Sequence, residues 1–301
     1  MSTRYGYLLL VIVWLSWGPS YPFTAIVLRS MDVWTSRCLI TTAAGVLMLV
    51  LVRAGGRSIA VPRSAWRDLG VSALFNIAIF QIGMTYGVSL LSPGRTSVII
   101  YTMPVWASLF AVGMLGERLT PPRILALALG LAALIVLMSQ DLSRLGNAPL
   151  GAALTLMAAI SFGFGTVWMK RRRWQTDLTV LAGWQLLLGA IPIWLIWLLL
   201  RPEFRWETPD FEGWLAILFL ALVSNALAYF AWFRVIAIFP AMISGIGTLG
   251  VPIVGVLSSA VLVGEAIGWR ELTALLLVCS ALSLVLLVGA PSPRPAATQG
   301  D

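Results

Sequence analysis

Two stretches of this chain share one pattern: YTMPVWASLFAVGMLGERLT, residues 101–120, and LGVPIVGVLSSAVLVGEAIG, residues 249–268. Each carries a proline in an apolar segment and a Gly-Glu pair beyond it. Pro104 precedes Glu117, and Pro252 precedes Glu265, by the same 13 residues, and the two stretches are 148 residues apart. A pattern that recurs at one fixed offset indicates an internal repeat.

Composition places the chain in a membrane. Of its 301 residues, 59% are hydrophobic and 11% are charged, whereas soluble domains carry about 25% charged residues. A chain this apolar could not cover a water-facing surface with polar groups. We therefore predict an all-α integral membrane protein.

The apolar segments predict ten transmembrane helices, since one bilayer crossing needs about 20 apolar residues. The first of these segments is long and lacks a clear cleavage site, so we expect it to be retained. The predicted spans are 5–28, 33–52, 66–90, 94–115, 122–139, 148–169, 178–200, 213–234, 241–263 and 270–289.

The 148-residue offset places spans three, four and five on spans eight, nine and ten. We predict two five-helix repeats, residues 1–145 and 146–290, followed by a disordered tail at 291–301. Because five is odd, the second repeat enters the membrane from the opposite side. The fold class expected is thus a 5+5 bundle of two inverted-topology repeats, whose substrate site lies near mid-membrane.

Basic residues predict the orientation. Under the ten-span topology, 13 of the 20 basic residues fall on the face that holds both termini. The other seven, Arg37 among them, are assigned to the opposite face. Basic loops stay in the cytoplasm, so both termini are expected inside the plasma membrane, the inner membrane of a bacterium. The cluster 170–173 is interpreted as an anchor at the lipid surface, with no nucleic-acid partner.

A proline within a helix removes one backbone donor and displaces the carbonyl four residues earlier. Pro104 would free the carbonyl of Ile100, and Pro252 that of Thr248. Such groups are tolerated in a membrane only against protein or a watery cavity. Packed kinks are the alternative, but two at matching positions favour flexion points beside a cavity.

Polar and aromatic side chains near these prolines are the candidate lining of a substrate pathway. Helix–helix hydrogen bonding is the competing interpretation for each of them. The pairs Gly116-Glu117 and Gly264-Glu265 stand at span ends, where we expect a structural role. The pathway candidates are Trp17, Asn76, Tyr86, Tyr101, Trp106, Trp168, Asn225, Tyr229 and Thr248.

These motifs resemble those of a known family. MPVWASLFAVGMLGERLT, VPIVGVLSSAVLVGEAIG and WLSWGPSY resemble the drug/metabolite transporter (DMT) superfamily, and within it the EamA-type exporters, with ten helices in two inverted repeats. The aromatic content looks most like the YddG-type exporters of aromatic amino acids. The second repeat departs from the pattern, with Phe164-Gly165 in place of Trp17-Gly18 and Ala266-Ile267 after Glu265.

The leading hypothesis is a secondary transporter that exports small organic metabolites, aromatic or amphipathic amino acids first, by alternating access. Drugs, nucleobases and sugars are alternative solutes. No Asp, Glu or His lies in the centre of a predicted span, which favours facilitated diffusion or exchange. No cofactor or metal is expected, and the protein is expected to act as a monomer.

A membrane enzyme and a structural subunit are the alternatives from other classes. The chain has no histidine, which removes the commonest general base. Its single lysine, Lys170, stands at a span end, so a Ser-Lys dyad at depth is not available. A structural subunit would need a partner chain and would carry no solute.

The inverted repeat makes a direct prediction. Single cysteines introduced in the loops after Glu117 and after Glu265 should react with a membrane-impermeant maleimide from opposite sides, as intact cells and inverted vesicles can show. Labelling of both loops from one side would contradict the inverted topology.

Overall fold

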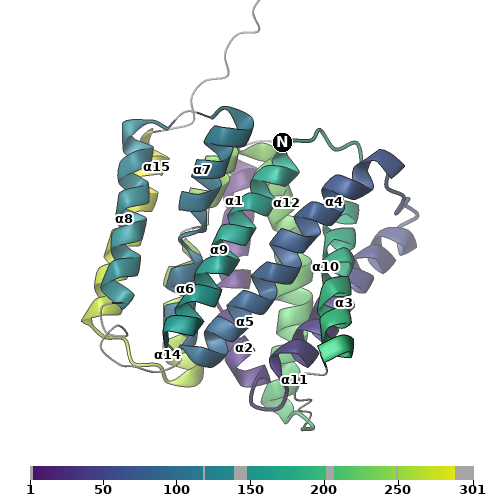
Figure 1. The fold of residues 1–301 in the computed structure, drawn as a ribbon, viewed down its shortest axis with the longest axis horizontal. Coiled ribbons are helices and arrows are strands. Elements are labelled where there is room, and N and C mark those ends of the chain that lie inside the picture. Colours follow the sequence, from purple (N-terminus) through teal and green to yellow (C-terminus); the bar gives the residue numbers. More distant parts are fainter. Residues whose placement is uncertain (1–2, 118, 139–147, 201–206, 249, 289–301) are drawn as a thin grey trace, which may run out of the picture.

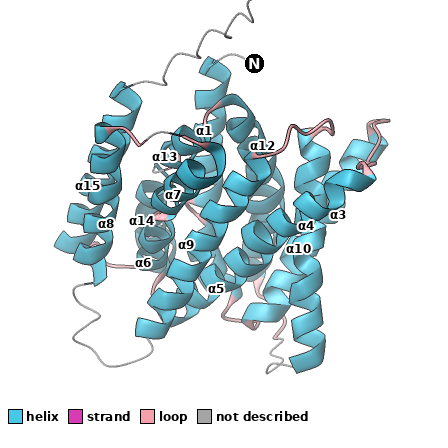
Figure 2. Ribbon diagram, turned by 45° about the horizontal axis from the view of Figure 1, so that its top comes forward, coloured by secondary structure: helices cyan, strands magenta, loops and turns pink. Residues whose placement is uncertain are grey.

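The computed structural model describes residues 3–117, 119–138, 148–200, 207–248 and 250–288. All regular structure in these ranges is helical (Figures 1 and 2). The expected tail at 291–301 lies outside the described residues. From the N-terminus the elements are α1 (Thr3–Trp17), α2 (Ser20–Val27), α3 (Val33–Ala54), η1 (Arg63–Ala65), α4 (Trp66–Ala73), η2 (Leu74–Ile79), α5 (Phe80–Leu90), α6 (Pro93–Ile100), α7 (Met103–Leu115) and α8 (Pro121–Met138). They continue with α9 (Ala148–Lys170), α10 (Leu178–Leu200), α11 (Phe211–Leu218), η4 (Phe219–Leu227), α12 (Ala228–Ile238), α13 (Ala241–Gly247), α14 (Gly250–Val263) and α15 (Trp269–Val288).

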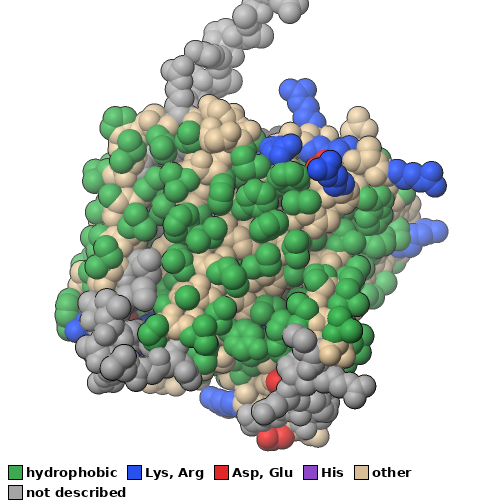
Figure 3. Space-filling view, in the orientation of Figure 1, with side chains coloured by type: hydrophobic (Ala, Val, Ile, Leu, Met, Phe, Trp, Pro, Cys, Tyr) green, Lys and Arg blue, Asp and Glu red, His purple; other side chains and the backbone are tan. Residues whose placement is uncertain are grey.

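Seven stretches of described helix are long and apolar enough to cross a membrane. They cover the first four predicted spans and spans six to eight. The remaining three spans correspond to α8, α13 with α14, and α15, and the count of ten stays a prediction. The outer surface is apolar (Figure 3), with Leu51, Leu199 and Val261 exposed by 61%, 79% and 83%. Such a surface suits lipid rather than water.

The two prolines interrupt their helices instead of bending them. α6 ends at Ile100 and α7 starts at Met103, so Pro104 stands in the first turn of α7. Pro252 likewise stands in the first turn of α14, after α13 has ended at Gly247. A proline in the first turn gives up no intrahelical hydrogen bond. α1 and α2 are separated in the same way at Gly18-Pro19.

Two further irregularities are π-helical, η2 and η4, in which the backbone bonds skip one residue more than in an α-helix. A π-helical turn inserts an extra residue and leaves carbonyls available to other donors. Each segment divides a 28-residue helical stretch, Arg63–Leu90 and Phe211–Ile238. The sequence pattern carries no signal for them.

Side chains from neighbouring helices supply donors to these carbonyls. In η2, Ser161 donates to the carbonyl of Phe75, and the Tyr229 hydroxyl donates to that of Asn76 at 3.2 Å. In η4, Trp17 Nε1 donates to the Ser224 carbonyl at 3.0 Å. These carbonyls are therefore satisfied inside the bundle, as a membrane requires.

Helix pairs pack in matching arrangements when residue numbers are shifted by 148. α8 packs on α15 at one edge of the bundle, and α3 packs on α10 at the other (Figure 1). Between them, α5 packs on α9 as α12 packs on α1, and α7 packs on α9 as α14 packs on α1. α9 is continuous where α1 and α2 are separate, which is the main departure from this correspondence.

The Gly-Glu pairs end their helices with one geometry. Gly116 and Gly264 adopt φ values of 66° and 69°, in the left-handed region that glycine enters without strain. The Glu265 carboxylate then accepts hydrogen bonds from the Gly94 amide at 2.9 Å and from the Ser92 hydroxyl. A carboxylate at this position stabilises the start of α6.

Close packing of α5 on α9 depends on Gly83. A Cβ there would lie 2.7 Å from the Leu154 carbonyl oxygen, which belongs to the backbone and cannot rotate away. We predict that Gly83→Ala lowers the free energy of unfolding by about 1–3 kcal/mol through overpacking. Thermal unfolding in detergent, followed by tryptophan fluorescence, measures the loss.

Gly70→Ala is the matched control, since a Cβ at Gly70 meets nothing within 4 Å. It should leave the melting temperature unchanged or raise it, because alanine favours helix. Equal melting temperatures for the two variants would refute the close approach.

Candidate functional site

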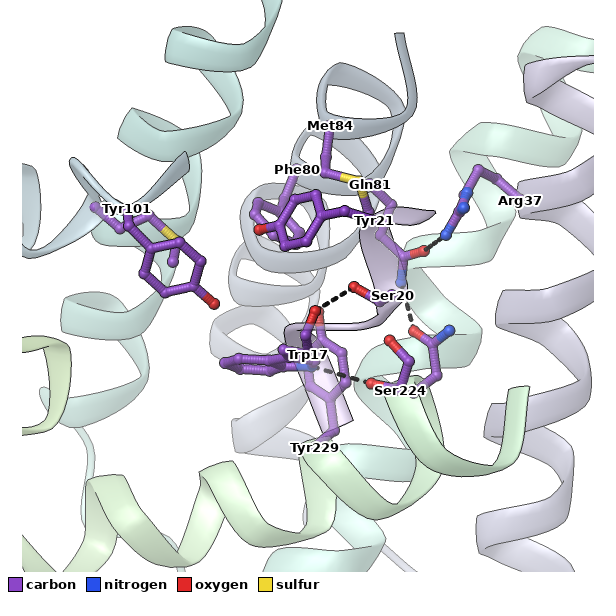
Figure 4. A pocket seen from close by; sticks show the side chains of 12 residues that line it. Trp17, Ser20, Tyr21, Arg37, Phe80, Gln81, Met84, Tyr101, Ser224 and Tyr229 are labelled. Carbon is purple, nitrogen blue, oxygen red and sulfur yellow. Dashed lines mark hydrogen bonds between the residues drawn. The ribbon is translucent and has the colours of Figure 1, made fainter. Parts of the chain in front are cut away.

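A buried cavity lies where the interrupted helices and the π-helical segments meet (Figure 4). Its walls come from α2 and the end of α1, from α3, from the start of α5, from the break between α6 and α7, and from η4 and α12. The lining residues are Trp17, Ser20, Tyr21, Arg37, Phe80, Gln81, Met84, Tyr101, Met103, Ser224, Asn225 and Tyr229.

A chain of hydrogen bonds crosses the polar wall of this cavity. Arg37 Nη1 donates to Gln81 Oε1 at 3.2 Å, and Gln81 Nε2 donates to Asn225 Oδ1 at 2.8 Å. Thr41 shares the same Gln81 oxygen at 3.3 Å. Asn225 Nδ2 turns back to the Leu220 carbonyl at 2.8 Å within η4. Gln81 therefore connects α3 to η4.

Asn225 owes its position to the π-helical turn. Its side chain donates to the carbonyl five residues earlier, the acceptor that a π-helical backbone bond would use. On the same wall, Gln81 is the second residue after η2, near the start of α5. The two amides meet because each π-helical segment shifts the helical register beside the cavity.

Aromatic rings form the other wall. Trp17 packs against Phe162, Tyr229 and Trp232, with ring centroids 5.6–5.8 Å apart. Rings at these separations attract one another beyond the area they bury. Trp17 is also held by its bond to the Ser224 carbonyl. Figure 4 shows Trp17 and Tyr229 below the cavity and Arg37 at its side.

The cavity is small in this structure. Its volume is about 30 Å³. Such a space holds about one or two waters, whereas sites for organic ligands enclose about 300–1,000 Å³. An organic molecule could enter only after the surrounding helices separate. The structure is thus a compact conformation of the site.

Four of the nine pathway candidates line this cavity: Trp17, Tyr101, Asn225 and Tyr229. Trp17 and Tyr101 come from the first half of the chain, and Asn225 and Tyr229 come from the second. Each was singled out by a polar or aromatic side chain inside an apolar span, and the structure gathers these four around one space.

The other five candidates lie elsewhere. Asn76 contacts the wall through its carbonyl, and Tyr86 accepts a hydrogen bond from Trp34. Trp106 donates to Thr102. Trp168 packs on Phe164 with Arg171 over its ring, and Thr248 is buried at the break after α13.

Arg37 lies in a different place from the one expected. The sequence pattern assigns it to the face opposite the termini, but the structure buries it in α3 with 2% exposure. Asp32 caps this helix by accepting from the Thr35 amide at 2.9 Å, so Arg37 stands one turn inside. The predicted span 33–52 begins where α3 begins and contains Arg37, so the error came from counting every basic residue as a loop charge.

Eight lining residues are absent from the predicted pathway: Ser20, Tyr21, Arg37, Phe80, Gln81, Met84, Met103 and Ser224. Gln81 is recognisable as a polar residue within its span. Ser20 and Tyr21 follow the break at Gly18-Pro19, and this break is the signal that could have pointed to them.

Among the residues that the structure describes, no group of His, Cys, Asp and Glu is placed to hold a metal ion. Cys38 and Cys279 are both free thiols. The cavity offers one guanidinium, amides, hydroxyls and aromatic rings. These groups can bind and orient a small molecule.

Comparison with known proteins identifies related chains. Residues 4–139 and 149–287 each match the model of the EamA-like transporter family. The chain is 25% identical to the uncharacterized transporter YvbV of Bacillus subtilis over 92% of its own length and 90% of that protein. It is 27% identical to the uncharacterized inner membrane transporter YedA of Escherichia coli K12, over 92% and 89%.

Protein PecM of Dickeya dadantii is 24% identical over 89% of this chain and 88% of that protein. A solved crystal structure superposes with a TM-score of 0.74 at 20% identity, covering 95% of this chain and 98% of the other. At that identity the likeness concerns the fold alone.

Gln81 makes a testable contribution to stability. Gln81→Leu would leave Arg37, Thr41 and Asn225 each short of one partner, at about 1–3 kcal/mol for each buried group. We expect this variant to melt at a clearly lower temperature than the wild type in detergent. Tryptophan fluorescence during a thermal scan measures the change.

Gln185→Leu is the control, since it removes a buried glutamine with fewer partners. The substitution removes the hydrogen bond that Gln185 donates to the Ser72 hydroxyl, while Ser72 still donates to the Leu69 carbonyl at 2.9 Å. A loss of stability in Gln185→Leu as large as that in Gln81→Leu would contradict the hydrogen-bond network.

Proposed function

The chain belongs to the EamA-like transporter family of the DMT superfamily and is a multi-pass membrane transporter; we propose that it exports small organic metabolites, aromatic or amphipathic amino acids first, by alternating access. The observation that carries this proposal is the polar and aromatic cavity at the centre of an apolar bundle. Polar and charged groups at such depth are costly in a membrane and usually mark a substrate pathway. No catalytic step is part of the proposal.

The proposed architecture is ten transmembrane helices in two inverted five-helix repeats, with residues 1–145 and 146–290 as the halves. The matching helix pairs, the paired breaks at α6–α7 and α13–α14, and the left-handed Gly116 and Gly264 support it. The family model also matches two successive segments of the chain. In this architecture the Gln81–Asn225 bond joins one half to the other.

Charge supports an orientation with both termini in the cytoplasm of a bacterial cell. Blue side chains gather at the upper right of Figure 3, the end of the bundle at which the chain begins. Arg57 pairs with Asp177 at 3.1 Å and Arg172 with Asp68 at 2.8 Å. Basic residues concentrate on the cytoplasmic side of membrane proteins.

Transport would proceed by rocking of the two halves about the cavity, with flexion at the helix breaks beside Pro104 and Pro252. Interrupted helices lack the continuous backbone bonds that resist such bending. Buried carboxylates, which proton-coupled carriers usually keep at depth, are missing from the described residues. This supports facilitated diffusion or exchange.

Another solute class is the second candidate: a drug, a nucleobase or a sugar metabolite. The small volume of the cavity in this conformation does not select among them. Flux of labelled amino acids, nucleobases, sugars and dyes through purified protein in liposomes decides between these classes. Absence of flux for every solute would contradict a transporter acting alone.

Tyr101 and Trp168 test the pathway. We predict that Tyr101→Ala slows solute flux about tenfold or more, because its ring lines the cavity at the α6–α7 break; this corresponds to about 1.4 kcal/mol in the rate-limiting barrier. Trp168→Ala should also slow flux, since the proposed pathway continues along α9. Initial rates of efflux from proteoliposomes give both effects.

The controls are Tyr7→Ala and Trp214→Ala, whose side chains are 48% and 46% exposed on the outer surface. Both should transport at the wild-type rate. Wild-type flux in Tyr101→Ala and Trp168→Ala would remove these residues from the pathway.

A further inference from the structure

We propose that Arg37 binds the carboxylate of the transported solute, so that the cavity takes an organic carboxylate with an apolar or aromatic body. This inference rests on the proposed transport function and specifies the chemistry of the same site. It begins from the burial of a charge that the described part of the fold does not neutralise.

Arg37 is the one charged side chain among the buried residues that the structure describes. It projects from α3 to the wall of the cavity (Figure 4). Guanidinium groups stay protonated at any physiological pH. A full positive charge therefore lies inside an apolar bundle, beside a cavity at its centre.

The partners of Arg37 are neutral. Nη1 donates to Gln81, Nη2 donates to the Thr24 hydroxyl at 2.9 Å, and Nε has no acceptor among the described residues. The ion pairs found in the described part of the chain involve other residues. Neutral acceptors replace only part of the hydration that a buried cation loses.

A carboxylate would complete this site. Its two oxygens match the forked donors of a guanidinium, and a charge-assisted pair shielded from bulk water is stronger than the bond to Gln81 that it would displace or share. The unpartnered Nε offers one donor that no protein acceptor occupies. The site is therefore preorganised for an anionic oxygen group and incomplete without one.

The rest of the cavity selects the body of the solute. Trp17, Phe80 and Tyr101 present aromatic surface across the cavity from Arg37 (Figure 4). A solute with a carboxylate at one end and an apolar body at the other would satisfy both walls once the helices separate. A cationic solute would meet the guanidinium charge with no carboxylate among the described lining residues to offset it.

Matched carboxylate and amide probes test the proposal on purified wild-type protein in detergent. The probes are 3-phenylpropionate against 3-phenylpropanamide, and phenylalanine against phenylalaninamide. Binding is measured by the rise in melting temperature with probe concentration. We expect at least one carboxylate to bind about tenfold more tightly than its amide, or better. Equal binding by the amides, or no binding by either carboxylate, would overturn the proposal.

Arg37→Gln separates a ligand-binding role from a structural one. The variant removes the buried charge, while a glutamine amide can still donate to Gln81. We expect carboxylate affinity to fall about tenfold or more, while the unliganded variant melts at the wild-type temperature or above it. Unchanged carboxylate affinity would overturn the proposal. So would a melting temperature far below the wild type, because the guanidinium would then be retained for the fold.

Arg29→Gln is the control, because Arg29 is exposed and pairs with Glu212 at 3.6 Å outside the cavity. It should bind the carboxylates as the wild type does. Flux assays on the same variants distinguish the two proposals. Solute flux that persists unchanged in Arg37→Gln would contradict the carboxylate site but not the transport function. No flux of any solute in the wild type would contradict the transport function itself.

Discussion

Backbone polar groups inside a bilayer must find partners within the protein, and the centre of this structure depends on that constraint. Within the described residues, helix breaks and two π-helical segments interrupt the regular bonding of the bundle. Side chains from other helices supply donors at these points: Tyr229 to η2, Trp17 to η4, and Trp14 to the Gly247 carbonyl at 2.7 Å. These bonds hold the irregular segments together, and the cavity lies among them.

The same arrangement explains how the centre could change shape. A continuous helix resists bending through its own backbone bonds, whereas an interrupted helix can rotate about the break. Here the break between α13 and α14 and the two π-helical segments accept hydrogen bonds from side chains of other helices. Exchanging those donors would allow the cavity to open while the helices that pack at its edges, α3 on α10 and α8 on α15, stay intact.

Much of this organisation could be predicted from the sequence, and some of it could not. Polar or aromatic character inside apolar spans pointed to Trp17, Tyr101, Asn225 and Tyr229, which do line the cavity. The same signal also pointed to Tyr86, which lies outside this cavity and accepts a hydrogen bond from Trp34. The π-helical turns of η2 and η4 depend on donors from other helices, so their sequences look like ordinary apolar helix. The predicted span 33–52 contains Arg37, but the charge count treated Arg37 as a loop residue and so missed its burial.

The central claim is that solute passes through the point where the interrupted helices meet. Ser20→Cys, in a background with Cys38 and Cys279 replaced by alanine, places a thiol in the cavity wall with little change in volume. The measurement is its reaction with a small membrane-impermeant thiol reagent, applied from each side of the membrane during transport. The account predicts reaction from both sides and protection by solute, while Ser72→Cys, buried outside the cavity, stays unreactive. A Ser20→Cys protein that transports normally but never reacts from either side would contradict it.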